Sequence, residues 1–388
     1  MEMDFRFSPE EERFREEVRH FLDAEVTEEV IEEVERGTEI GIGPNTWELM
    51  RRLGKKRWLA PAFPEEYGGM GATRWQQFIL TDEVSYHRAL PLGLCGVTIV
   101  GPMLLHSGSE AQKREYLPRI ARGEIDFALG YTEPEAGSDL ANLQIRAEKK
   151  GNFYCVNGQK TFNTGCHFAQ YVWLAVRTDP TVPKHKGISL LIVDMKTPGI
   201  TVRPLWVMDG ERSNEVFYDD VKVPVENLVG EENRGFYYIL TALSYERILP
   251  MGELRRIFEE FVGYIKDQGP SKDPLVQQHV AQLATELQAL YLIAYRVIWL
   301  IENKTAPNWE APMVKLYMTE FMRRFSNTAM EILGPCGQLQ KGSPWAPLMG
   351  RIERFYRHAA RRNISAGTSE IQRNTIARIG LNLPRGEG

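Results

Sequence analysis

The sequence predicts a mainly α-helical, multidomain protein of the α+β class: an N-terminal helical domain, a middle antiparallel β domain and a C-terminal four-helix bundle. Apolar residues recur at helical spacing before residue 122 and again, in longer segments, after residue 233. Short β-branched and aromatic runs, separated by Gly, Pro, Asn and Asp, lie between them. A chain of 388 residues is also too long for one core. We therefore expect domains at 1–122, 123–232 and 233–388.

Two helix starts in the N-terminal region carry local signals. Ser8, Pro9 and Glu11 have the spacing of a capping box, with apolar residues at helical spacing behind them. Ser109 precedes a second helical stretch that ends near Gly123. Between the two, the Gly/Pro-rich segment "FPEEYGGMGAT" indicates a break in the helices.

Four runs in the middle region read as strands: "FYCVNGQKTF", "YVWLAVRT", "ISLLIVDM" and "ITVRPLW". No helix-length segment separates them, which argues against a parallel βαβ sheet. Beyond them, residues 234–269 read as one long helix that contains Pro250, and "LVQQHVAQLATELQALYLIAYRVIWLIEN" is apolar nearly all round. Such a helix is typical of a buried bundle position or a subunit interface.

Composition excludes several classes of function. The net charge of −5, without a Lys/Arg-rich run, offers no field for a nucleic-acid backbone. The four cysteines form no C-x-x-C pair and the histidines no cluster, so we expect no metal. No apolar run reaches the roughly 18 residues of a membrane span, and the acidic N-terminus does not resemble a signal peptide. We expect a cytoplasmic protein.

Two polar stretches are candidates for a binding site. In "NISAGTSEIQR" (363–373), Thr368 or Ser369 can cap a helix, but hydroxyls and open N–H groups equally suit a cofactor. In "YTEPEAGSD" (131–139), the acids and hydroxyls suit either a surface turn or a site. The residues alone leave both alternatives open.

Four stretches together change this interpretation. "FPEEYGG", "YTEPEAGSD", "NGQKTFNTG" and "GTSEIQRNTIAR" resemble, in order and spacing, motifs of the acyl-CoA dehydrogenase family over essentially the whole chain. The resemblance implies FAD, an acyl-CoA thioester as substrate, an electron-transfer flavoprotein as acceptor and a tetramer. The helix–sheet–helix order found above is also that family's architecture.

The resemblance also assigns roles to single residues. FAD contacts are implied for Leu129, Thr132, Ser138, Phe162, Thr164, Thr368 and Glu370, with Glu331 and Gly334 reaching the FAD of a neighbouring subunit. Thr164 would meet flavin N5, and Phe162 stands where the family usually has Trp. Substrate contacts are implied for Ser138 at the pantetheine arm of CoA, and for Tyr245, Arg247 and Gly367.

The stretch "KDQGPSKDPLVQ" (266–277) departs from the family pattern, which usually has here an arginine that holds the neighbouring subunit's FAD pyrophosphate. Its absence makes an assembly of two unlike subunits an alternative to a homotetramer.

The second departure is at Ala366, where many relatives carry the catalytic glutamate. A smaller group places the base on the first long C-terminal helix, directly before an arginine, as Glu246 stands before Arg247 here. The resemblance implies that Glu246 takes the α-proton, flavin N5 takes the β-hydride, and the Ala366 N–H binds the thioester oxygen. The methyl group at position 366 favours a branched, cyclic or bulky acyl group.

Two rival hypotheses are a flavin oxidase or monooxygenase of the same superfamily, and a non-catalytic partner subunit.

Overall fold

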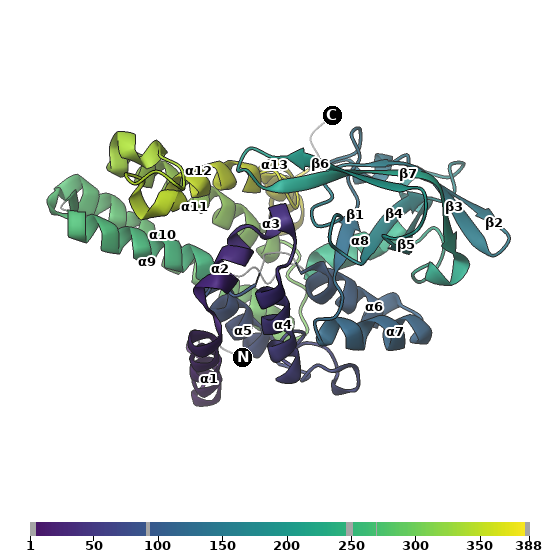
Figure 1. The fold of residues 1–388 in the computed structure, drawn as a ribbon, viewed down its shortest axis with the longest axis horizontal. Helices are drawn as coiled ribbons and strands as arrows, with labels where there is room; N and C mark the ends of the chain where they lie inside the picture. Colours follow the sequence, from purple (N-terminus) through teal and green to yellow (C-terminus); the bar gives the residue numbers. More distant parts are fainter. Residues whose placement is uncertain (1–4, 91–93, 246–250, 269, 385–388) are drawn as a thin grey trace. The chain divides into compact units, whose positions relative to one another are not determined.

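The computed structural model describes residues 5–90, 94–245, 251–268 and 270–384 (Figure 1). It confirms the predicted order of a helical region, a sheet and a second helical region. The helices are α1 (Pro9–Glu25), α2 (Glu28–Glu35), α3 (Gly37–Ile40), α4 (Pro44–Lys55), α5 (Arg74–Tyr86), α6 (Gly101–Ser107), α7 (Glu110–Ala121), α8 (Gly235–Tyr245), α9 (Gly252–Gln268), α10 (Pro274–Glu302), α11 (Glu310–Leu333), α12 (Arg351–Arg362) and α13 (Ser369–Thr375). The strands are β1 (Phe127–Gly130), β2 (Arg146–Lys150), β3 (Phe153–Lys160), β4 (Tyr171–Arg177), β5 (Ile188–Asp194), β6 (Ile200–Trp206) and β7 (Arg212–Pro224).

The chain divides into two compact units. Unit 1 comprises Met1–Asp23, Arg74–His87 and Arg247–Gly388, and unit 2 comprises Ala24–Thr73 and Arg88–Glu246. Unit 2 therefore contains the sheet, and unit 1 contains helices α9 to α13. The domain limits expected from the sequence, 1–122, 123–232 and 233–388, stay a prediction.

The predicted helix starts are present. The Ser8 N–H donates to the Glu11 carboxylate at 2.7 Å and the Glu11 N–H to the Ser8 hydroxyl at 3.2 Å, which is a capping box. Ser109 forms a second box with Gln112. Residues 234–269, read as one helix, hold two in the described part of the chain, because α8 ends at Tyr245 and α9 begins at Gly252.

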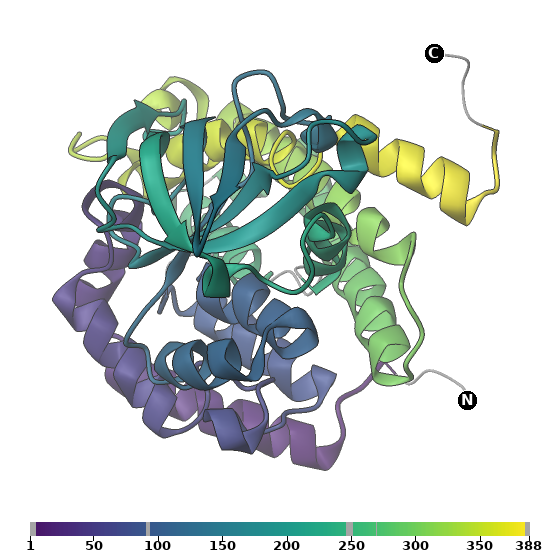
Figure 2. The ribbon, with the colours of Figure 1, turned by 90° about the vertical axis from the view of Figure 1, so that its right-hand side faces the viewer.

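The seven-stranded sheet of unit 2 has the order β1-β4-β2-β3-β7-β6, with β5 paired to β4. Most pairings are antiparallel, as predicted, but β1 pairs with β4 in parallel, and β2 meets β4 in parallel at one residue pair. Figure 2 shows the strands of this sheet side by side. Parallel neighbours need a long crossover. Here residues 131–170, which include β2 and β3, supply it in place of a helix.

Strands β1, β2 and β7 were not expected from the sequence. In β7, charged and apolar residues are mixed and buried positions only partly alternate with exposed ones. Its backbone is nevertheless fixed on both sides, by β3 and by β6. Pairing with two neighbours therefore outweighs the strand's weak local preference.

The core of unit 2 forms where the sheet meets α6 and α7. Strands β4 and β5 are buried along almost their whole length, which explains their continuous apolar runs. Trp173, Tyr154 and Phe127 are among the largest buried side chains. Met103 of α6 and Leu117 of α7 belong to the same core.

A buried ion pair holds the segment "YTEPEAGSD" to the sheet. The Lys160 Nζ lies 2.9 Å from the Glu133 carboxylate, and the two side chains are 0% and 6% exposed. Lys160 also donates to the Tyr131 carbonyl at 2.8 Å. Glu133 accepts the N–H groups of Gln144 and Ile145 at 2.6 and 3.1 Å. Burial lowers the pKa of Lys160 to about 8, although Glu133 opposes that shift.

Unit 1 is built on the long helices α9 to α12. The rings of Phe261, Phe325 and Phe355 meet in its core, with centroids 5.8 and 5.2 Å apart. By length and composition alone, α10 could cross a membrane. Within the described residues, 39% of its apolar window is buried, and Leu287 and Leu290 belong to the core of this unit.

The start of α9 is capped by side chains of α5. The Met251 N–H donates to the Asp82 carboxylate at 3.2 Å, and the Glu253 N–H to the Ser85 hydroxyl at 3.1 Å. An added Cβ at Gly252 would lie 2.0 Å from the Asp82 carbonyl oxygen. Only glycine therefore lets the two helices come this close.

We predict that Gly252→Ala lowers the midpoint temperature of thermal unfolding, because the new methyl group collides with backbone that cannot rotate away. The matched control is Gly263→Ala in the same helix, where an added Cβ meets nothing within 4 Å. That control should raise the midpoint slightly, since glycine in a helix interior costs about 0.5–1 kcal/mol relative to alanine. Equal midpoints for the two variants would contradict the prediction.

We also predict that Lys160→Met lowers the free energy of unfolding by about 3–5 kcal/mol, because it leaves the Glu133 carboxylate buried without its counter-charge. Adding Glu133→Gln should recover part of the loss. The control Lys150→Met breaks an ion pair to Glu148 whose side chains are more than half exposed, so it should cost less than about 1 kcal/mol. Denaturant titration of the four proteins tests this, and a Lys160→Met variant as stable as the control would refute it.

Candidate active site

The structure brings two of the predicted cofactor residues beside the turn that carries two others. The Asn163 side-chain amide donates to the Leu129 carbonyl at 2.7 Å, and the Thr161 N–H donates to the Thr132 carbonyl at 2.9 Å. Leu129 and Thr132 thus lie against the turn that contains Phe162 and Thr164. These four residues of unit 2 form one group, which we call the β1 cluster.

The turn at residues 161–165 has a specific backbone shape. Phe162 adopts a φ of 56°, and the residue is 58% exposed. The turn is fixed to β7, because the Asn163 N–H donates to the Asn214 carbonyl at 3.0 Å and the Asn214 amide returns a bond to the Asn163 carbonyl at 2.9 Å. The hydroxyls of Thr164 and Ser213 lie 3.1 Å apart. A left-handed, non-glycine residue held this firmly is typical of a functional turn.

The turn itself holds a buried polar atom without a partner and an exposed aromatic ring. The side-chain oxygen of Asn163, a residue only 1% exposed, has no hydrogen-bond partner among the residues described. Phe162 is more than half exposed, and Leu129 is only partly buried. Exposed apolar groups beside polar ones suit a flat ring with a polar edge, so these residues fit a flavin.

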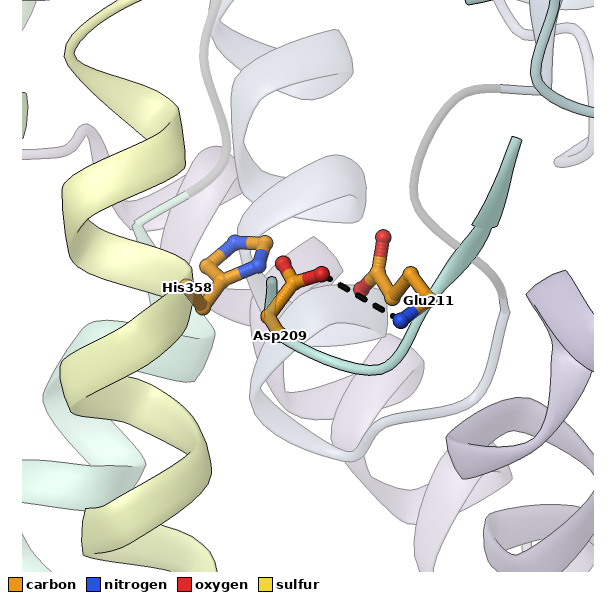
Figure 3. A group of neighbouring side chains, drawn as sticks. All are labelled: Asp209, Glu211 and His358. Atoms are coloured by element: carbon orange, nitrogen blue, oxygen red, sulfur yellow. Dashed lines mark hydrogen bonds between the residues drawn. The ribbon is translucent and has the colours of Figure 1, made fainter. Parts of the chain in front are cut away.

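A tight turn joins β6 to β7. Its Asp209 carboxylate accepts the Glu211 N–H at 3.2 Å (Figure 3). The Gly210 N–H donates to the Val207 carbonyl at 2.9 Å, with Gly210 in the left-handed region. Met208 lies in this turn, two residues beyond the end of β6, and the strand that follows the turn, β7, carries Ser213.

Ser138 lies on the loop that the Lys160–Glu133 pair anchors. Glu133 and Ala136 exchange backbone hydrogen bonds of 3.1 Å, so the loop turns sharply there. Ser138 is exposed beyond that turn, and the neighbouring Asp139 pairs with Lys184 at 2.6 Å. The serine hydroxyl is therefore open to a ligand.

In unit 1, the turn before α13 has the helix cap that one of the two alternatives predicted. The Thr368 hydroxyl accepts the Ile371 N–H at 3.2 Å. The Glu370 carboxyl accepts hydrogen bonds from the Glu370 N–H and from the Thr368 hydroxyl, and both lower its pKa. Thr368 and Glu370 therefore act as a helix cap, and this role does not exclude a contact with a cofactor.

The same turn also offers free backbone donors. Ala366 has a φ of 53° and Gly367 a φ of 86°. The N–H groups of Ala366, Gly367 and Thr368 donate to no acceptor in the described part of the chain. Successive N–H groups in such a conformation form a concavity that binds anions. The cap and the binding site are thus compatible.

Glu331 and Gly334 are not brought to this turn. Glu331 lies in the last turn of α11, and Gly334 is the C-cap residue of that helix. Lys315, whose ammonium contacts the Gly367 carbonyl, lies 16 residues before Glu331. At about 1.5 Å per residue, this separation is about 24 Å along the helix. A role for Glu331 at a different subunit's site is consistent with that distance.

A cavity of about 260 Å³ opens between α10 and α11. It is lined by His279, Gln282, Leu283, Glu286, Arg324, Asn327 and Thr328. Glu331 follows Thr328 by three residues and Asn327 by four, so it shares their face of α11. Glu331, the residue predicted to contact a neighbouring subunit's FAD, therefore lies on the same face of α11 as the polar residues that line the cavity.

Three predicted substrate or catalytic residues cannot be placed. Glu246 and Arg247 lie outside the described residues. Tyr245 is the last residue of α8, and its side chain is also outside the description. Their roles stay proposals.

Sequence reasoning missed four residues that organise the site: Glu133, Lys160, Asn163 and Lys315. One of them carried a readable signal. In "APMVKLYM", Lys315 stands four residues after Ala311 and three before Met318, both buried, so a lysine falls on the buried face of a helix. The partners of the other three are too distant in sequence for any local pattern to reveal them.

Models of known families match the chain in three consecutive parts. The N-terminal, middle and C-terminal domains of acyl-CoA dehydrogenase match residues 8–124, 128–221 and 233–381, respectively. Together they cover most of the chain in the order of its three regions.

Single proteins are similar over nearly the full length. Acyl-CoA dehydrogenase FadE26 of Mycobacterium tuberculosis is 35% identical over 401 residues, covering 99% of each chain. A solved structure described as the Tcur3481-Tcur3483 steroid ACAD is 36% identical with a TM-score of 0.92, over 99% of this chain and 100% of that one. The ChsE4-ChsE5 complex of M. tuberculosis is 34% identical with a TM-score of 0.89, over 99% and 100%.

Fold order, the grouped motif residues and these similarities agree. The chain belongs to the acyl-CoA dehydrogenase family and is an oxidoreductase that acts on acyl-CoA.

Proposed function

We propose that this protein catalyses the FAD-dependent α,β-dehydrogenation of a bulky acyl-CoA thioester to its 2-enoyl-CoA, with a steroid-type acyl group as the leading candidate. The observation that carries the proposal is the turn at Ala366–Thr368, with its three open N–H groups. A thioester oxygen that gains negative charge needs such donors. The similarity to a steroid-acting family member supports the substrate class, as does the small side chain at position 366.

The β1 cluster is the proposed site for the flavin ring. Leu129 and Phe162 offer apolar contact, and Thr132 and Thr164 offer hydroxyl groups. Thr368 and Glu370 are proposed to lie near the adenosine part. When bound, FAD supplies a hydride acceptor at N5 of its ring.

The chain's own residues then handle the proton and the charge on oxygen. We assign Glu246 as the base that takes the α-proton, and the Ala366 N–H as a donor to the thioester oxygen. A positioned general base is most effective when its pKa lies near the working pH. Ser138, Tyr245, Arg247 and Gly367 are the proposed substrate contacts.

We further propose a cytoplasmic tetramer of unlike subunits that passes electrons to an electron-transfer flavoprotein. Unit 1 exposes apolar side chains near the C-terminus, with Ile371 40%, Ile379 52% and Leu381 66% exposed, and such a row suits a subunit contact. The absence of an arginine from residues 266–277 suggests that a different chain completes one of the cofactor sites.

For the base, we predict that Glu246→Gln binds the thioester but slows anaerobic flavin reduction by about 10²–10⁴-fold, because glutamine cannot accept the proton. Adding Ala366→Glu should restore part of the rate, with a preference for slimmer acyl chains. Stopped-flow flavin bleaching with a panel of thioesters measures both effects. Reduction of Glu246→Gln at the wild-type rate would remove Glu246 from the mechanism, and rapid reoxidation by air would favour an oxidase.

For the assembly, we predict that the chain purified alone contains little FAD. Co-expression with an unlike acyl-CoA dehydrogenase chain should give a yellow tetramer of about four times 44.5 kDa, because the partner supplies the missing cofactor contacts. Light scattering and flavin absorbance measure this. A yellow, fully active homotetramer would contradict the unlike-subunit proposal, and a chain that stays colourless in the mixed tetramer would indicate a non-catalytic subunit.

A further inference from the structure

Lys315 makes a contact with the Ala366–Thr368 turn that the mechanism above does not use. Its ammonium donates to the Gly367 carbonyl at 2.6 Å, across 52 positions of sequence. The side chain reaches there from the middle of α11 and is half-buried. A charged donor on a carbonyl at this distance is a strong hydrogen bond.

The turn needs such a contact because its conformation is strained. A left-handed φ at alanine is disfavoured and persists only where surrounding groups hold it. The remaining side-chain bonds to the Ala366 and Gly367 carbonyls come from Gln372 and are longer, at 3.3 and 3.4 Å. Lys315 is thus the strongest of the described contacts at this point of the turn.

Helix α11 also holds the other end of the turn. The Asn363 amide donates to the Thr319 carbonyl at 3.3 Å, and Thr319 lies one helical turn after Lys315. Asn363 in turn accepts the Ser369 N–H and hydroxyl, both at 3.1 Å. Both ends of the turn are therefore fixed to the same rigid helix.

We propose that Lys315 is a positioning residue for the thioester carbonyl: its ammonium orients the Ala366–Gly367 backbone so that the open N–H groups point at the substrate oxygen. The inference rests on the proposed function and adds a residue to it. Lys315 itself contacts neither substrate nor cofactor in this assignment.

Charged groups around Lys315 come from three helices. Glu320 lies on α11, Arg362 on α12 and Glu370 on α13. Burial and Arg362 lower the pKa of Lys315 to about 8, against the two carboxylates, and Glu320 is itself paired with Arg373. The ammonium is thus present at neutral pH and is lost as the pH rises through about 8, which weakens its hydrogen bond to Gly367.

The test is Lys315→Met in the FAD-loaded assembly, which keeps the length of the side chain and removes its donor. We expect flavin reduction to slow by about 10- to 100-fold, less than the roughly 10²–10³-fold loss from removing an oxyanion donor itself. Thioester Kd and FAD content should change less than about threefold. The rate loss from Lys315→Met should also shrink above pH 8, where the wild-type ammonium is lost.

A second readout does not require turnover. A conjugated arylacryloyl-CoA absorbs at longer wavelength when its carbonyl is polarised by hydrogen bonds, so the red shift on binding should be smaller in Lys315→Met than in wild type. Lys315→Arg keeps a cationic donor and should recover part of both signals. It also replaces Lys315→Met as the test variant if the latter does not fold, with a partial loss of both signals expected.

The matched control is Arg323→Met, which removes an exposed cation from the same helix and should leave rate and red shift unchanged. The proposal is overturned if Lys315→Met behaves like this control, or if its rate falls only in step with lost FAD and a lower unfolding temperature. If no thioester reduces the wild-type flavin, the proposed function fails instead, and the red shift still decides whether Lys315 polarises a bound carbonyl.

Discussion

The buried ion pair between Lys160 and Glu133 is the interaction on which the β1 cluster depends. Neither charge could be buried alone, since an unpaired ion in the interior costs several kcal/mol. Because the two charges neutralise each other, both side chains can be buried and can bind backbone groups. Lys160 binds the Tyr131 carbonyl, and Glu133 binds the N–H groups of Gln144 and Ile145. Thr132 lies between Tyr131 and Glu133, so its position follows from that pair. The ion pair thereby fixes the loop that carries Thr132 to the sheet.

In unit 1, a helix fixes the turn that carries the open N–H groups. The turn before α13 contains a strained alanine, and strain persists only where neighbouring structure determines the backbone from several sides. Helix α11 does so through Lys315 and Thr319, while Phe321 and Phe325 of the same helix are fully buried in the core. The binding turn is therefore attached to a helix whose aromatic side chains are packed in the core. Open N–H groups and a firm frame are what a carbonyl site requires.

Signals confined to a few residues were sufficient for much of the fold. The capping box at Ser8, the cap at Ser109 and four of the strands follow from spacing and side-chain type, and Thr368 was one of two residues proposed as a possible cap. Strands β2 and β7 did not, because charged residues mask their alternation and pairing partners hold them in place. The parallel pairing of β1 with β4 depends on a crossover of about 40 residues, which no local pattern encodes.

The sequence by itself determined the order of helical and sheet regions, the family through four motifs, and the residue types available for a cofactor and a thioester. Only the tertiary structure decided how those residues are held. The bonds Lys160–Glu133, Asn163–Leu129 and Lys315–Gly367 join positions 27, 34 and 52 residues apart. Helical periodicity and capping act within one or two turns of chain. Contacts between distant segments form only when burial of the cores brings those segments together, so their partners cannot be read from the residues around them.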